Sequence, residues 1–137
     1  QHHCGIWLSD DRGATWQEIT DAQPSNFGFA VAVHPHHPDQ AWFVPLAKDV
    51  MRVPVNGETV VSHTKDSGKS FVVLHEGLPA SNAYTLVYRH GLDVNDQGQL
   101  IMGSTTGDLW CGGAAGFITL SRDLPLIYAV RWVGASA

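Results

Sequence analysis

The stretch Ser9-Asp10-Asp11-Arg12-Gly13-Ala14-Thr15-Trp16 has a second copy later in the chain, Thr64-Lys65-Asp66-Ser67-Gly68-Lys69-Ser70-Phe71. A hydroxyl residue, an aspartate, a glycine, a second hydroxyl residue and an aromatic residue keep the same spacing in both copies. Aspartate accepts hydrogen bonds from backbone N–H groups a few residues on, and glycine adopts a positive φ without a Cβ clash. The motif therefore predicts a tight turn between two antiparallel strands. We expect Asp11 and Asp66 to stabilise these turns rather than to act in catalysis.

A third, altered copy of the unit follows. The aromatic residue of each copy precedes a proline by eight positions: Trp16 precedes Pro24, Phe71 precedes Pro79 and Phe117 precedes Pro125. The turn before Phe117, at residues 112–116, is shorter and glycine-rich, and it has no aspartate. We expect glycine flexibility to replace the carboxylate in this turn.

Apolar runs of strand length separate these turns, and no segment has a helical period. The runs form two sets of four, at residues 29–34, 40–46, 59–64 and 71–74, and at residues 84–90, 99–104, 108–111 and 117–120. The sequence thus predicts one all-β domain of antiparallel four-stranded units over residues 1–137. It is expected to hold a hairpin (5–19), two full units (27–74 and 82–120) and a final strand (126–133).

With these motifs the chain resembles an Asp-box (BNR repeat) β-propeller, and it is similar to bacterial sialidase-like proteins of this kind that have no assigned activity. The resemblance covers essentially the whole chain and also includes His34-Pro35, Pro38-Asp39 and Gly103-Ser104-Thr105-Thr106-Gly107. It implies propeller blades, about two complete and others partial. It specifies no activity, because the repeat occurs in hydrolases, receptors and assembly factors.

Composition excludes several classes of function. The chain is 44% hydrophobic and 15% charged, which suits a folded core and argues against disorder. The net charge is −5 and there is no basic stripe, so we expect no binding to nucleic acid. No run reaches the ~20 apolar residues of a membrane span, and no signal peptide is visible. We predict a soluble protein without membrane contact, in a compartment that the sequence leaves open.

Two features invite a metal or a disulfide, and we predict neither. Cys4 and Cys111 are isolated from each other and form no disulfide framework, so we expect free thiols. Residues 34–37, His-Pro-His-His, lie at the turn between the first two strands of a unit, where the resemblance implies a His-Pro turn. No carboxylate or cysteine is placed beside them by the sequence. No metal and no cofactor are therefore predicted.

The expected ligand site lies at the end of the units away from the aspartate turns. The resemblance implies this end, which carries the turn between the second and third strands and the connection to the next unit. A long insert, residues 47–58, lies in the first of these turns, and long loops on a rigid scaffold often carry function. We also expect Phe29 and Tyr84, each five residues after a proline, to be equivalent. The candidate ligand-binding residues are Asn26, Phe27, Lys48, Asp49, Arg52, Asn82, Tyr84 and Thr105.

Two classes of function are open. The favoured one is a non-catalytic binding or interaction module for a glycan or a protein, to which exposed aromatic residues such as Phe27 and Trp132 would contribute. The alternative is a sialidase-like glycoside hydrolase or its remnant. Such enzymes use a tyrosine nucleophile with a glutamate, an aspartate acid/base and arginines that bind a carboxylate. The nearest candidates are Tyr84 or Tyr128 with Glu76, and Arg52 and Arg131, but no spacing in the sequence connects them.

The partial units at residues 5–19 and 126–133 raise the question of closure. We predict a homo-oligomer, with a dimer favoured, in which a neighbour's final strand joins the sheet of the first hairpin. The alternatives are a piece of a longer protein and an open array of sheets. A hydrolase would be active only with its blades completed.

Overall fold

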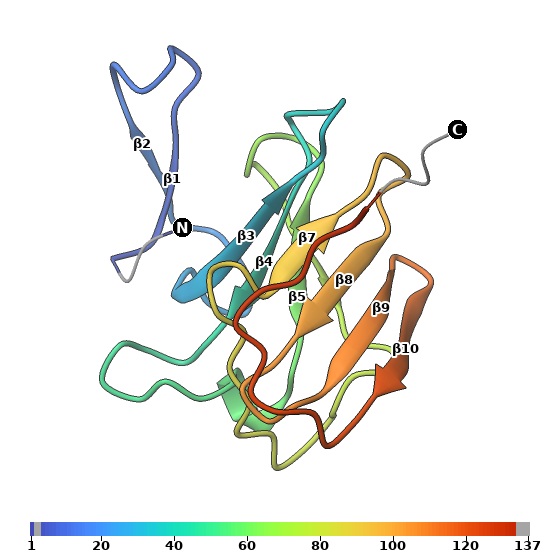
Figure 1. Cartoon of the computed structure of the whole chain (residues 1–137). Helices are drawn as coiled ribbons and strands as arrows, with labels where there is room; N and C mark the ends of the chain where they lie inside the picture. Colours follow the sequence, from blue (N-terminus) through green and yellow to red (C-terminus); the bar gives the residue numbers. More distant parts are fainter. Residues whose placement is uncertain (2–3, 134–137) are drawn as a thin grey trace.

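The computed structural model describes residues 1 and 4–133, and it is all-β apart from one short 3-10 helix in that part of the chain (Figure 1). It contains a two-stranded sheet and two four-stranded sheets, and every pairing within them is antiparallel. The two-stranded sheet pairs β1 (Ile6–Leu8) with β2 (Gln17–Ile19). The next sheet contains β3 (Gly28–Val33), β4 (Ala41–Pro45), β5 (Val61–Thr64) and β6 (Val72–Leu74). The last contains β7 (Leu92–Val94), β8 (Leu100–Gly103), β9 (Leu109–Gly113) and β10 (Gly116–Ser121).

Strand order within each sheet follows chain order, as a series of hairpins requires. The predicted all-β class and the four-stranded antiparallel units are therefore confirmed. Both aspartate turns lie where the repeat predicts them, one between β1 and β2 and the other between β5 and β6. The 3-10 helix, Val55–Gly57, lies in the insert between β4 and β5.

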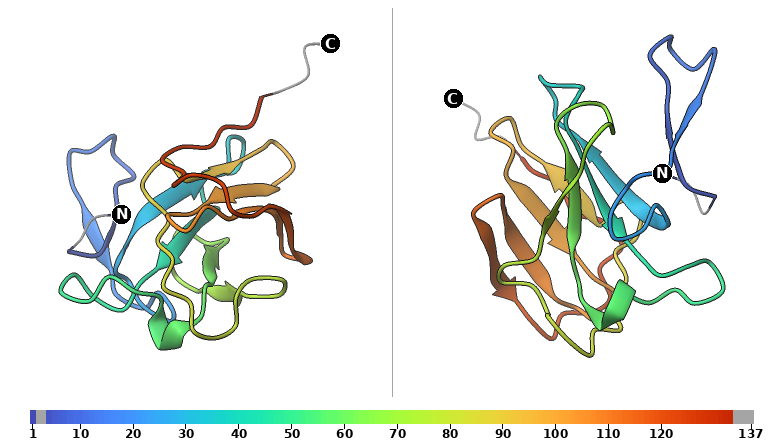
Figure 2. Two further views of the ribbon diagram at one scale, coloured as in Figure 1. Left: turned by 60° about the horizontal axis from the view of Figure 1, so that its bottom comes forward. Right: turned by 180° about the vertical axis from the view of Figure 1, so that it is seen from behind.

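The three sheets stack face to face, with the β3–β6 sheet in the middle (Figure 2). The main core lies between the two four-stranded sheets, and its largest members are Trp42 and Trp110. A smaller core joins the hairpin to the other face of the middle sheet, through Ile6, Ile19 and Phe43. The described residues form an open stack rather than a closed ring, so the predicted propeller is not itself observed.

Two predicted strands are wrong. Residues 84–90 form no ladder, and the first strand of the last sheet is β7 instead. Residues 126–133 form no named strand, and Ala129 makes only an isolated parallel bridge with His90. The predicted equivalence of Phe29 and Tyr84 is also wrong. In the turns after β3 and β7, the backbone N–H groups of His34 and Asn95 donate to Gln40 O and Gln99 O, so these two residues are equivalent. Phe29 lies five residues before His34, and the residue five before Asn95 is His90, not Tyr84.

Hydrogen bonds between connections show that each sheet has two distinct ends. At one end Ser67 N, in the β5–β6 turn, donates to Asp39 O in the β3–β4 turn. At the other end Ala83 N, in the connection to the last sheet, donates to Gly57 O in the insert. We call these the turn end and the insert end. Within the described residues no helix has the length and apolarity needed to cross a bilayer.

Candidate functional site

The first aspartate turn is closed by its own side chains. Asp11 Oδ1 accepts from Thr15 N at 2.8 Å, and its Oδ2 accepts from Thr15 Oγ1 at 2.6 Å. Ser9 Oγ donates to Asp11 and accepts from Gly13 N at 2.7 Å. Arg12 and Gly13 have positive φ values, 62° and 89°, which is why the motif carries a glycine here. The carboxylate therefore has both oxygens engaged within the turn.

The second aspartate turn repeats this geometry. Asp66 accepts from Ser70 N at 2.9 Å and from Ser70 Oγ at 2.5 Å, while Thr64 Oγ1 accepts from Gly68 N at 2.8 Å. The hydroxyl bonds from Thr15 and Ser70 are the main reason that the pKa of each aspartate, Asp11 and Asp66, falls to about 2. Both carboxylates are therefore ionised near neutral pH, and both oxygens of each accept hydrogen bonds within the turn.

The third turn, between β9 and β10, does without a carboxylate. It is reduced to Ala114 and Ala115 between the two strands, and Gly116 takes a φ of 108°. This agrees with the prediction that glycine replaces the aspartate at this position.

The insert end brings two arginines onto one phenylalanine. The Arg52 guanidinium carbon lies 5.4 Å from the centre of the Phe29 ring, and that of Arg89 lies 5.7 Å from it. Phe27 contacts Phe29 edge-on at 5.5 Å between ring centres. We call Phe27, Phe29, Arg52 and Arg89 the Phe29 cluster. Its members come from the start of β3, from the insert and from the segment before β7.

The two arginines of the Phe29 cluster differ in their ion pairing. Arg52 is paired with Asp49, with its Nη2 at 2.6 Å and its Nε at 3.1 Å from Asp49 Oδ1. In the part of the chain that the structure describes, no carboxylate lies within ion-pair distance of Arg89. Arg89 is exposed, and its charge is therefore available to a ligand. The cluster thus carries one unneutralised positive charge on a chain whose net charge is −5.

The structure does not bring the remaining predicted site residues together in one place. Asn82 and Tyr84 line a shallow pocket of about 220 Å³ together with Thr106 and Asp108. Thr105 Oγ1 accepts from Leu86 N at 3.0 Å and holds the segment before β7, which is a structural contact. Two further candidates lie apart from that pocket: Asn26 lies beside Gly5, and Lys48 pairs through its backbone with Met51. Of the eight predicted residues, Phe27, Asp49 and Arg52 are thus brought together, and Arg89 was missed.

The residues proposed for hydrolysis do not converge. Tyr128 stacks on Tyr88 at 5.5 Å, and Tyr84 lies in the pocket beside Asn82. Glu76 lies against the β9–β10 turn, where its backbone oxygen accepts from Phe117 N. No contact among the described residues joins Glu76 to either tyrosine.

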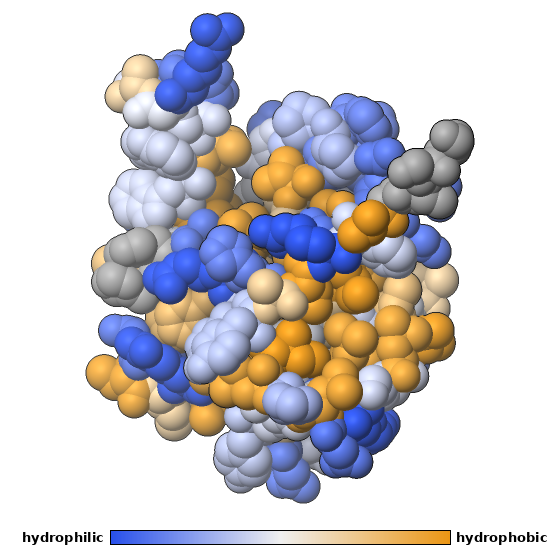
Figure 3. Space-filling model, in the orientation of Figure 1, coloured by the Kyte–Doolittle hydropathy of each residue, from blue (hydrophilic) through white to orange (hydrophobic). Residues whose placement is uncertain are grey.

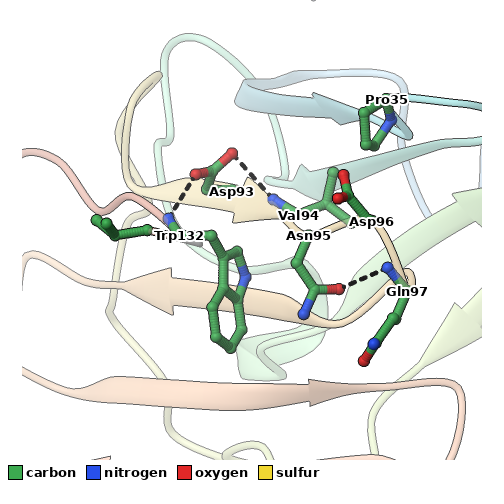
Figure 4. Close-up of a pocket in the computed structure, with 8 residues that line it drawn as sticks. Pro35, Asp93, Val94, Asn95, Asp96, Gln97 and Trp132 are labelled. Atoms are coloured by element: carbon green, nitrogen blue, oxygen red, sulfur yellow. Dashed lines mark hydrogen bonds between the residues drawn. The ribbon is translucent and has the colours of Figure 1, made fainter. Parts of the chain in front are cut away.

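A larger pocket, of about 440 Å³, lies at the turn end (Figure 4). Trp132 forms one wall, and Asp93 fixes it by accepting from Trp132 N at 2.8 Å. The other oxygen of Asp93 accepts from Val94 N, and Asn95 Oδ1 accepts from Gln97 N. Asp93 and the Asn95 side chain are therefore committed to internal bonds, whereas Trp132 Nε1 is buried with no hydrogen-bond partner in the described part of the chain.

His63 occupies an unusual position between the sheets. Its ring stacks on Trp42 at 4.4 Å, and its Nε2 is buried without a hydrogen-bond partner in the structure. Burial first, and the charge of Lys65 second, lower the pKa of His63 to about 4. Among the described residues no group of three or more His, Cys, Asp or Glu side chains has a geometry that would hold a metal. No disulfide joins Cys4 and Cys111 in this part of the chain.

No protein-family model matches this chain, and a search of curated proteins finds no similar sequence. Function is therefore inferred from the geometry of the sheets and of the Phe29 cluster.

Proposed function

We propose that this chain is a non-catalytic binding module whose four-stranded sheets are blades of a β-propeller. Two observations support the blades: strand order in the two larger sheets follows the chain, and the sheets stack face to face in the same sequence. Such a stack places the insert ends of successive sheets side by side, where a channel mouth would lie.

The ligand is a sugar that carries a carboxylate, and it binds at the Phe29 cluster. The observation that carries this proposal is the pair of guanidinium groups, 5.4 and 5.7 Å from the Phe29 ring centre, of which only Arg52 has a carboxylate partner. Guanidinium groups bind carboxylates through paired N–H donors. The Phe29 ring is half-buried and provides an apolar surface for a sugar ring, whereas Phe27, which contacts it edge-on, is buried and not exposed as the sequence predicted. Arg89 is the residue that would bind the carboxylate, and Asp49 keeps Arg52 in place beside it.

The test is a titration of the protein with glucuronate, N-acetylneuraminate and glucose, followed by NMR. Glucose controls for the pyranose ring without the carboxylate. Arg89→Gln is expected to weaken binding of both acids about 10-fold to 100-fold, because a charge-assisted hydrogen bond contributes about 1.5–3 kcal/mol. Arg122→Gln is the matched control, since Arg122 is also exposed and lies just after β10.

Equal affinity of the wild-type protein for glucuronate and glucose would contradict carboxylate recognition. Equal losses in Arg89→Gln and Arg122→Gln would show that only net charge matters. Either result would remove the Phe29 cluster as the site.

A glycoside hydrolase of the sialidase type is the second candidate, and the convergence of two arginines favours it. It also needs a nucleophile and its base, and Tyr84, Tyr128 and Glu76 are not brought together. We therefore expect no release of fluorophore from 4-methylumbelliferyl N-acetylneuraminate. Turnover that Arg89→Gln abolishes would favour the enzyme over the binding module.

A further inference from the structure

The two outer layers of the stack expose apolar positions that are buried elsewhere in the repeat. Aligning the three copies of the turn motif shows which residues are equivalent in the three sheets. Those facing backward, toward the N-terminal side of the stack, are Trp7 and Trp16, then Ser62 and Phe71, then Trp110 and Phe117. Those facing forward are Ile6 and Ile19, then Val61 and Leu74, then Leu109 and Leu120.

Exposure of these positions depends on whether a neighbouring sheet is present. The backward residues of the last sheet, Trp110 and Phe117, are 2% and 6% exposed, whereas Trp7 and Trp16 of the hairpin are 40% and 60% exposed. The forward residues show the opposite trend. Those of the hairpin and of the middle sheet are buried, while Leu120 is 51% exposed and its neighbour Ile118 is 65% exposed. Among the described residues, each outer layer therefore has one apolar face that no neighbouring sheet covers, and the two faces are of opposite kinds.

The interface inside the chain shows how the two kinds pack. Trp110 and Phe117 of the last sheet lie in one buried cluster with Val61 and Leu74 of the middle sheet. Backward aromatic residues thus pack on forward aliphatic residues. By the same pairing, Trp7 and Trp16 are complementary to Leu109 and Leu120. A copy of the chain has both halves of this contact, on opposite sides.

The C-terminal segment covers only the inner part of the outer face of the last sheet. Ile127 packs on Gly103, where an added Cβ would lie 2.4 Å from the Ile127 side chain, and Val130 N donates to His90 O. The outer part, formed by β9 and β10, stays open. Figure 3 shows apolar side chains gathered on this side of the molecule. This part contains the exposed Ile118 and Leu120 and the half-buried Leu109 and Cys111, which together we call the β9–β10 face.

We propose that the β1–β2 hairpin of one copy packs through Trp7 and Trp16 on the β9–β10 face of a second copy. The contact continues the internal sheet-to-sheet interface with the same pairing of residue types. It is a head-to-tail contact, so association of the wild-type chain proceeds beyond a symmetric dimer, toward a ring or a longer stack. The proposal does not depend on ligand binding at the Phe29 cluster.

The test uses two variants, each with one face blocked by a charge. Trp16→Lys blocks the hairpin and Ile118→Lys blocks the β9–β10 face. Analytical ultracentrifugation should show self-association of the wild-type chain that weakens about 30-fold or more in either variant. Mixed in equal amounts, the two variants each retain one complementary face and should form a 1:1 heterodimer. Val50→Lys, at an 89% exposed position in the insert, should associate like the wild type.

Circular dichroism checks that each variant is folded, which the exposure of Trp16 and Ile118 leads us to expect. A wild-type chain that stays monomeric up to near-millimolar concentration would overturn the proposal. Normal association of either variant would also overturn it. So would a mixture of the two variants that stays monomeric, because the proposed contact joins two different faces and the mixture contains one intact copy of each.

Discussion

The turn end and the insert end of the sheets use their polar residues in opposite ways. At the turn end, Asp11 and Asp66 each accept hydrogen bonds with both oxygens from within their own turn. At the insert end, Arg89 is exposed over an aromatic ring and has no carboxylate partner among the described residues. The sequence signal is strongest at the first end, where it is a repeated motif, and weaker at the second, where it is only a long insert.

This difference separates stability from binding. A side chain whose hydrogen-bonding capacity is used internally can be repeated from unit to unit, because its partners are a few residues away in the same motif. A side chain whose hydrogen-bonding groups are unused has no partner a few residues away, so no sequence motif identifies it. We therefore expect changes at the turn end to alter unfolding and changes at the insert end to alter binding.

The largest expected effect on stability comes from Thr64→Val. The Thr64 hydroxyl is buried, donates to Asp66 and accepts from Gly68 N. Valine keeps the shape but leaves the half-buried Gly68 N–H and one Asp66 contact without the Thr64 hydroxyl, which costs about 1–3 kcal/mol. Chemical denaturation should show the loss, with binding of glucuronate unchanged.

Ser9→Ala is the matched change in the first aspartate turn. Ser9 makes the same two bonds in a hairpin at the edge of the stack, where water replaces lost partners more easily. We expect a smaller loss, below about 1 kcal/mol. A loss in the free energy of unfolding as large as that of Thr64→Val would show that burial of the hydroxyl group does not determine the size of the effect.

The next effect is a pH dependence that comes from His63. The pKa of His63 is about 4 in the folded chain, below its ordinary 6.5. The unfolded state therefore binds a proton between pH 6.5 and 4 that the folded state does not, and the free energy of unfolding falls as pH drops through this range. Above pH 6.5 the His63 side chain is neutral in both the folded and the unfolded state, so it no longer lowers the free energy of unfolding. His63, next to Trp42, is thus an acid-sensitive position at the turn end, in a pH range above the folded-state pKa values of Asp11 and Asp66.

His63→Phe should remove this part of the pH dependence and keep the aromatic stacking on Trp42. The control is His75→Phe, at an exposed residue beside Glu76. His34 and His37 line the same pocket as His63, together with Lys65 and Asp96, so they are kept unchanged in both variants. Denaturation midpoints measured from pH 4 to 7 decide the matter. Parallel curves for the wild type and His63→Phe would rule out His63 as the origin.

The smallest expected effect on stability is that of Arg89→Gln. The exposed guanidinium makes no ion pair that the structure shows, and a cation–π contact at an exposed site contributes only about 0.5–1 kcal/mol. The denaturation midpoint should shift by less than that of Thr64→Val, while glucuronate binding weakens about 10-fold to 100-fold. A large destabilisation would mean that Arg89 has a structural role instead.

The sequence predicted the four-stranded units because the turn motif is local. Its aspartate, glycine and hydroxyl residues interact within eight positions, so spacing alone reveals them. The error at residues 84–90 has a physical cause. Ala83, Thr85 and Val87 are buried and alternate with more exposed residues, as in a strand, but the segment lies between the sheets without a ladder partner.

The Phe29 cluster could be predicted only in part. Long loops favour function, and this consideration led to Asp49 and Arg52. Arg89 was missed because it lay inside a predicted strand, and its approach to Phe29 depends on how two sheets stack. Contacts between sheets have no fixed sequence spacing, whereas contacts within a turn do.

The most direct measurement is an amide NMR spectrum recorded while glucuronate is added. Shift changes are expected at Phe27, Phe29, Arg52 and Arg89, with none at residues 9–16 and 64–71. Changes concentrated in those two turns would contradict the assignment of binding to the insert end and of stability to the turn end.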